Sequence, residues 1–179
     1  MKTYVALLRA INVGGKNKLP MTDLVEIFSD AGCVNVRSYI QSGNVIFSAS
    51  PRCAARLPVL IPTRVGERFG HKPPIILRTA EQIETVFATN PFLKMGAPEE
   101  TLHVMFLADV PAPGAVKALD PDRSPPDTFL VQGQEIYLRM PNGMGETKLT
   151  NAYFDSKLAT ISTARNWRTV GKLLELMRG

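Results

Sequence analysis

The chain has 179 residues, of which 45% are hydrophobic and 21% are charged, and its formal net charge is +5. This composition is typical of a folded globular protein and excludes a disordered or fibrous chain. Every apolar stretch is far shorter than the roughly 18 residues of a membrane span, so we expect no membrane partner. The only cysteines, Cys33 and Cys53, form no CxxC or Cys/His cluster, which indicates a reducing compartment and a cytoplasmic protein.

The basic excess lies in residues 1–90, whereas acidic and basic side chains balance in residues 91–179. A moderate excess of this kind favours anionic partners, which here are an anionic small molecule, a nucleotide or a nucleic acid. No feature of the sequence identifies a protein partner.

Residues 1–90 predict the order β-α-β-β-α-β of a ferredoxin-like sandwich. The predicted elements are a strand over residues 4–11, a helix over 21–32, strands over 34–40 and 45–48, an irregular helix over 55–70, a strand over 74–79 and a helix over 80–90. Arg9 interrupts the first apolar run, which favours a strand over a signal peptide. Thr22 and Gly32 are expected to cap the first helix, and Pro58 and Pro62 to break or kink the second.

Residues 91–179 repeat most of this order. The predicted elements are a strand over residues 102–108, a short helix over 114–120, hairpin strands over 127–133 and 135–140, and helices over 150–160 and 164–177. The strand that would complete a second sandwich is missing from this prediction, and the closing C-terminal helix takes its place. We therefore predict an α+β protein of two tandem ferredoxin-like modules, residues 1–90 and 91–179, with antiparallel sheets and helices on one face.

Familiar catalytic motifs are absent. The GGKN segment lacks the GxxxxGK(S/T) spacing of a P-loop, no GxGxxG follows a strand, and no GxSxG surrounds a serine. His71 and His103 are interpreted as structural or solvent-exposed histidines, and no carboxylate pair stands out as general acid and base. We therefore expect neither a metal nor a cofactor.

Polar, amide-rich segments at the ends of elements remain as candidates. The first is NVGGKN, from Asn12 to Asn17, between a strand and a helix. Gly14 and Gly15 would let backbone N–H groups converge, and Lys16 adds charge, so the segment is a candidate anion-binding nest. Alternatively, the glycines only form the turn and the asparagine side chains cap it.

The second segment is QSGN, which comprises Gln41, Ser42, Gly43 and Asn44 and offers amide and hydroxyl groups near Tyr39. An ordinary hairpin turn is the favoured interpretation, because Gly-Asn is good turn chemistry by itself.

The third segment is TARNWRTVGK, residues 163–172. Arg165, Arg168 and Lys172 could grip a phosphate or carboxylate, Asn166 could add a hydrogen bond and Trp167 a stacking surface. Alternatively, the cations are solvated and Trp167 packs into the core, which is the interpretation we favour for the tryptophan. A glycine-containing loop with Gly143, Gly145 and Lys148 is read as a plain connection.

Three stretches of the chain, RAINVGGKN, YIQSGNVIF and ARNWRTVGKL, closely resemble the domain-of-unknown-function 1697 family. Its members typically show RGINVGGKN, TYIQSGNV and TTRNWNTVxKL, and the resemblance runs from the first strand to the last helix. It implies two ferredoxin-like modules and no particular reaction. The positions that match the motifs are Arg9, Asn12, Gly14, Gly15, Lys16, Asn17, Gln41, Ser42, Gly43, Asn44, Arg165, Asn166, Trp167, Thr169 and Lys172.

Three positions depart from the family pattern. Ala10 replaces the usual glycine, which would cost little if the backbone there is extended. Ala164 and Arg168 also differ, which puts any hydroxyl or amide role there in doubt.

We therefore expect a binding module whose anion site lies where the three segments meet, at the junction of the two modules. Arg9, Lys16 and Arg165 would be its cations, and the hydrogen-bonding groups would come from Asn12, Asn17, Gln41 and Asn166. One alternative is an enzyme on a phosphorylated or amide-bearing substrate, with Lys16 or Tyr39 as base if its pKa were shifted. The other is a structural or partner-binding protein whose polar motifs join the modules.

The strand VIFSA lacks the aromatic stacking pattern of an RNA-recognition motif, which argues against sequence-specific binding of RNA despite the shared topology.

Overall fold

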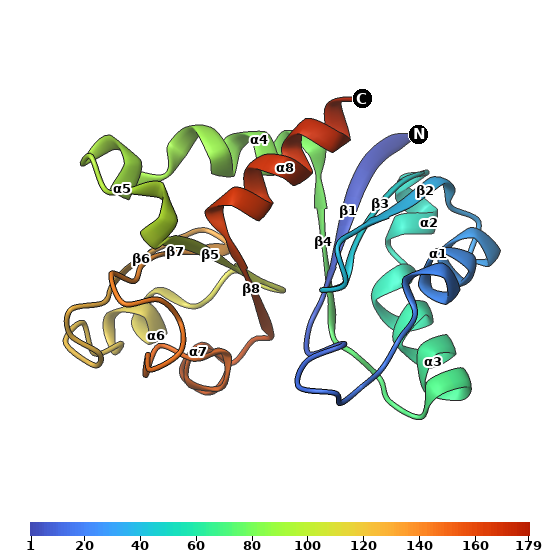
Figure 1. Cartoon of the computed structure of the whole chain (residues 1–179). Helices are drawn as coiled ribbons and strands as arrows, with labels where there is room; N and C mark the ends of the chain where they lie inside the picture. The colour runs from blue at the N-terminus through green and yellow to red at the C-terminus, as the bar shows by residue number, and fades with distance from the viewer. The chain divides into compact units, whose positions relative to one another are not determined.

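The computed structural model describes residues 1–179, and the chain divides into two compact units (Figure 1). Unit 1 comprises Met1–Glu84 together with Leu173–Gly179, and unit 2 comprises Thr85–Lys172. The predicted domain ranges, residues 1–90 and 91–179, stay a prediction. None of the helices has the length and apolar character needed to cross a membrane.

Unit 1 contains a four-stranded antiparallel sheet in the order β2-β3-β1-β4. Its elements are β1 (Lys2–Leu8), α1 (Met21–Asp30), β2 (Val34–Tyr39), β3 (Asn44–Ala49), α2 (Pro51–Ala54), α3 (Leu57–Phe69), β4 (Ile75–Thr79) and the first half of α4 (Ala80–Thr89). The β-α-β-β-α-β order and the strand order are those of a ferredoxin-like sandwich, as the sequence predicts.

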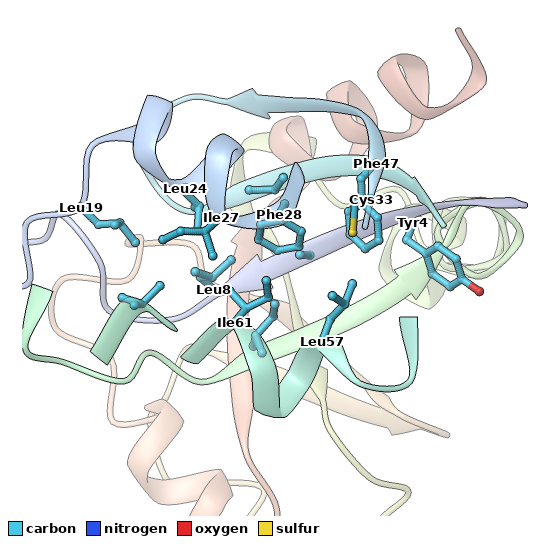
Figure 2. Close-up of a cluster of buried hydrophobic side chains, with 14 of the residues drawn as sticks. Tyr4, Leu8, Leu19, Leu24, Ile27, Phe28, Cys33, Phe47, Leu57 and Ile61 are labelled. Carbon is cyan, nitrogen blue, oxygen red and sulfur yellow. The ribbon is translucent and has the colours of Figure 1, made fainter. Parts of the chain in front are cut away.

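The core of unit 1 lies between one face of this sheet and helices α1 and α3. Leu8 of β1 and Phe47 of β3 meet Phe28 of α1 and Ile61 of α3, all at most 1% exposed (Figure 2). Strand residues alternate between the two faces of a sheet, whereas helical residues three or four apart share one face. These two periods bring the apolar side chains of strands and helices into one layer.

Helix α3 is continuous from Leu57 to Phe69, so of the two predicted effects of its prolines, a break or a kink, the break was wrong and the kink stays a prediction. Pro58 falls in the first turn, where a backbone N–H has no intrahelical partner and its loss costs little. Pro62 lies inside the helix and removes one backbone hydrogen bond. Ile61 and Val65 are fully buried in the core beside it, and this packing outweighs the lost bond.

The beginning of α1 also differs from the expectation. The helix begins at Met21 with Pro20 at the N-cap position and no side-chain cap, so Thr22 does not cap it. Gly32 follows the helix with φ of +93°, as predicted for its left-handed end.

Unit 2 contains a second four-stranded antiparallel sheet, in the corresponding order β6-β7-β5-β8. Its elements are the second half of α4, α5 (Pro91–Lys94), η1 (Glu99–Thr101), β5 (Leu102–Leu107), α6 (Pro113–Lys117), β6 (Thr128–Gln132), β7 (Glu135–Arg139), α7 (Asn151–Leu158), β8 (Ser162–Asn166) and the beginning of α8 (Trp167–Arg178). Met105, Leu138 and Phe154 are fully buried in its core.

The second sandwich is complete, so the prediction that it lacks its last strand was wrong. Ser162–Asn166 forms β8, which pairs with β5 along its whole length. Helix α8 consequently begins at Trp167 rather than at Ala164, and the Asn166 side chain caps it by accepting a 2.8 Å bond from the Thr169 N–H. The strand sequence STARN is short and polar, so neither its propensity nor its periodicity identifies it.

The first testable prediction concerns Gly43, the glycine between strands β2 and β3. Gly43 has φ of +80°, and a Cβ placed on it would lie 2.8 Å from Ile11 Cδ1 and 2.9 Å from Leu8 Cβ. Strain at positive φ and overpacking of buried side chains should together make Gly43→Ala unfold about 2–4 kcal/mol more easily. Urea denaturation measures this loss.

Gly133→Ala is the matched control, because Gly133 has φ of +58° and open space around it. It should lose only the backbone part, about 1 kcal/mol. Equal losses in the two variants would show that the close packing around residue 43 contributes nothing.

Candidate functional site

The first two polar segments come together in unit 1. The Asn12 side-chain amide donates to the carbonyl oxygen of Leu19, at 2.9 Å, and to that of Gln41, at 3.0 Å. Its Oδ1 atom accepts the Leu19 N–H at 2.8 Å. A single asparagine therefore joins both ends of the loop after β1 to the β2–β3 turn. We call residues 9–18 the glycine loop and residues 40–43 the hairpin turn.

A tight turn forms the outer part of the glycine loop. Gly14 and Gly15 have φ of +57° and +75°, and the Lys16 N–H donates to the Val13 carbonyl at 3.0 Å. Positive φ at both central residues is the geometry of a type I′ turn, which glycine enters at no steric cost. The backbone N–H groups of Gly14 and Gly15 have no hydrogen-bond partner in the chain, and both residues are exposed.

The basic and amide side chains of this loop divide into two kinds. Lys16 and Lys18 are exposed, whereas Arg9 is half-buried. Asn17 is exposed as well, but its amide donates to the Ala10 carbonyl at 2.9 Å and so holds the loop closed. The loop therefore combines asparagine side chains that bond to its own backbone with two lysines that are exposed to solvent.

The backbone of the two loops is strained. Six non-glycine residues in the chain have positive φ, and Ala10, Asn12, Asn17 and Ile40 all belong to the glycine loop or the hairpin turn. Asparagine tolerates this region, but Ile40 is β-branched and Ala10 has no polar side chain to compensate. The condition under which alanine at residue 10 would cost little, an extended backbone, is not met, because Ala10 has φ of +57° where the family motif has glycine.

The hairpin turn has an exposed part and a buried part. Gln41 and Ser42 are exposed, whereas Asn44 is fully buried. The Asn44 amide donates to the Tyr39 carbonyl at 3.1 Å and to Ser42 Oγ at 2.9 Å. Asn44 therefore stabilises the turn, while the Gln41 side chain is exposed to solvent beside it.

The third polar segment belongs to unit 2. Trp167 is 1% exposed and stacks on Phe87, with ring centroids 4.9 Å apart, so it is a core residue. Asn166 caps α8, and Lys172 lies half-buried later in the same helix. A meeting of all three segments stays a prediction, because only the first two lie in one unit.

Arg165 lies on strand β8 and is 8% exposed. Its Nη1 atom donates to Thr163 Oγ1 at 2.9 Å and to the Ala164 carbonyl at 2.8 Å. Loss of hydration lowers its pKa to about 10, so the guanidinium remains a cation at neutral pH. Buried charges are costly to leave unpaired, and these contacts give Arg165 a structural role whatever it binds.

The other candidate groups are built into the fold. The Lys148 backbone N–H donates to Ser124 Oγ at 3.0 Å and its carbonyl accepts from Arg123 Nε at 2.9 Å, which supports a plain connection there. Burial lowers the pKa of His103, which keeps its imidazole neutral at neutral pH. The chain contains no group of three or more His, Cys, Asp or Glu side chains arranged to hold a metal.

The two cysteines lie side by side in unit 1, which the sequence does not predict because they are distant in the chain. The Cys33 side chain is buried, and the Cys53 thiol donates to the Ala31 carbonyl at 3.5 Å. Burial, and secondarily Cys53, raises the pKa of the Cys33 thiol to about 12. A thiol that stays protonated is a poor nucleophile, so Cys33 is a poor candidate for a catalytic nucleophile.

These observations define an α+β protein of two tandem ferredoxin-like units. The chain belongs to the family described as a protein of unknown function (DUF1697), whose model matches residues 1–137. The third motif, at residues 165–172, lies beyond the matched range. A search among curated proteins found no match.

A solved structure supports the fold over the whole chain. It is that of the conserved bacterial protein SP0830 from Streptococcus pneumoniae, with a TM-score of 0.73 and 22% sequence identity. The match covers 100% of this chain and 99% of the other. At this identity the likeness shows the fold alone.

A second prediction concerns the strained backbone at Ala10. Ala10→Gly should stabilise unit 1 by about 0.5–1 kcal/mol, because removing the left-handed strain outweighs the added freedom of the unfolded chain. Chemical denaturation measures the change. Ala118→Gly is the control, because Ala118 has φ of −82° and should be destabilised instead; a loss of stability in both variants would contradict the strain at residue 10.

The Cys33 thiol makes a third prediction, about pH. Its folded pKa of about 12 lies above the unfolded value of 9.0. Between these values the unfolded chain releases a proton that the folded chain keeps, so stability falls as the pH rises. The contribution is fully present below about pH 9. Urea denaturation below and above this pH should show a smaller fall in the free energy of unfolding for Cys33→Ala than for the parent. Equal falls would contradict the raised pKa of the Cys33 thiol.

Proposed function

We propose that unit 1 binds a small phosphorylated or otherwise anionic molecule at the surface formed by the glycine loop and the hairpin turn. The observation that carries the proposal is the strain in these two loops, held in place by the Asn12 amide. Left-handed conformations at non-glycine residues cost of order 1–3 kcal/mol each, and such strain clusters at functional sites. The side chains of Ala10 and Ile40 have no polar atoms, so no side-chain hydrogen bond offsets the strain at these two residues.

The charge of the surface supports an anionic ligand. Lys16 and Lys18 are exposed on the glycine loop, and Gly14 and Gly15 present unbonded N–H groups next to them. No aspartate or glutamate occurs in residues 9–18 or 40–43. Ammonium groups beside free backbone N–H groups are a common arrangement for phosphate oxygens.

Nucleic acid is the less favoured anion. In RNA-recognition motifs, aromatic side chains on the open face of the sheet stack on bases. The aromatic residues of the central strands of unit 1, Tyr4 and Phe47, instead stack on each other within the helix-covered core, with ring centroids 5.6 Å apart. This packing leaves phosphate contacts as the mode of binding that the loops support.

The alternative with specific support is a structural role. The amides of Asn12, Asn17 and Asn44 are all engaged within the chain, as they would be if the motifs only shaped the loops. These bonds account for the asparagines but not for the exposed lysines. An enzyme with Lys16 or Tyr39 as base remains a further prediction, without a group in the structure that favours it.

Thermal unfolding in the presence of inorganic phosphate, pyrophosphate and a panel of phosphorylated metabolites tests the proposal. A ligand at about a hundred times its Kd should add roughly 2.7 kcal/mol, which raises Tm by about 5–11 °C for a chain of this size. The double variant Lys16→Ala/Lys18→Ala should unfold like the parent without ligand and should lose the shift.

Lys117→Ala is the matched control, because Lys117 is also exposed but lies in α6 of unit 2, and it should keep the shift. A short single-stranded RNA belongs in the same panel; stabilisation by RNA alone, lost as salt rises, would replace the small-molecule ligand with nucleic acid. No shift with any anion would overturn binding and favour the structural role.

A further inference from the structure

Unit 2 contains a cavity that belongs to none of the polar segments. It has a volume of about 470 Å³ and lies between the turn that follows α5 and the two strands β6 and β7. Its walls come from Phe92, Met95, Gly96, Ala97, Pro98, Thr128, Phe129, Leu130 and Arg139. Pockets for small ligands have volumes of about 300–1,000 Å³, so this one is large enough to hold a ligand.

Most of this wall is apolar. Phe92 is buried and Phe129 is half-buried. Met95 is 75% exposed and Leu130 is 43% exposed, so two large apolar side chains stand at the opening in contact with water. Methionine adapts its shape to an occupant at low cost. The cavity therefore fits the apolar part of a ligand.

One charged side chain interrupts the apolar wall. Arg139, the last residue of β7, lines the cavity, and its Nε atom is buried without a hydrogen-bond partner in the chain. A buried donor that belongs to a charged group is expensive to leave unpaired. No aspartate or glutamate is among the residues that line the cavity, so nothing in the wall competes for the guanidinium.

We propose that this cavity binds a small amphipathic carboxylate, with its hydrocarbon or aromatic body against Phe92, Phe129 and Leu130 and its carboxylate on Arg139. The guanidinium offers parallel N–H groups that match the two oxygens of a carboxylate. Binding would place the carboxylate against the guanidinium and bury the exposed apolar surface at the opening. The site lies wholly in unit 2 and is independent of the anion site proposed for unit 1.

Calorimetric titration of the full chain with three probes tests this inference. Octanoate has both parts of the ligand, octanamide has the same body without the charge, and acetate has the charge without the body. Octanoate should bind about 10–100-fold more tightly than octanamide, and acetate should not bind. Shifts of the Met95 methyl signal in NMR spectra should follow octanoate binding.

Arg139→Met tests the role of the guanidinium. It removes the unpaired donor and keeps an unbranched apolar side chain, so we expect a folded protein that binds octanoate and octanamide equally. Arg168→Met is the matched control, because Arg168 is an exposed arginine of α8 outside the cavity, and it should retain the preference for octanoate. Equal binding of the two probes by the parent, a preference that survives Arg139→Met, or no binding of octanoate would each overturn the proposal.

Discussion

The shape of the candidate site in unit 1 depends on the hydrogen bonds of the Asn12 side chain. Its amide replaces backbone hydrogen bonds that a loop of this shape cannot make, by joining Leu19 and Gln41 across segments distant in sequence. Buried or half-buried backbone groups need partners, and a side-chain amide can serve a donor and an acceptor at once. The glycine loop and the hairpin turn are therefore joined directly, so their strained backbone and their basic side chains belong to one surface.

The two units share one topology but use it differently. In unit 1 the loops at one end of the sheet carry lysines, glycines and positive φ, whereas unit 2 has a cavity with an arginine in an apolar wall. A fold of this kind does not define a function by itself. The differences lie in loops and strand ends, where a ferredoxin-like sandwich tolerates variation without disturbing its core.

Much of the fold follows from the sequence, since strands such as β1 and β5 are apolar runs and helices such as α1 and α4 have clear periodicity. The errors have physical causes. The strand β8 is short and polar, so only its pairing with β5 defines it, and α3 survives Pro62 because Ile61 and Val65 are buried on one side. For the candidate site, the motifs single out the two loops that the Asn12 side chain joins. They do not reveal that Asn12 and Asn44 are engaged internally, or that Arg139 lines a cavity, because those facts depend on contacts between distant residues.

The last helix has a consequence for how the chain acquires its structure during synthesis. Residues 173–179 belong to unit 1, where the Arg37 side chain of β2 donates to the Leu176 carbonyl and Arg178 pairs with Glu84. Unit 1 is therefore discontinuous, and the residues that complete it are synthesised after the whole of unit 2. Contacts so distant in sequence form slowly, and the N-terminal module cannot finish folding ahead of the C-terminal one, as domains made in order usually do.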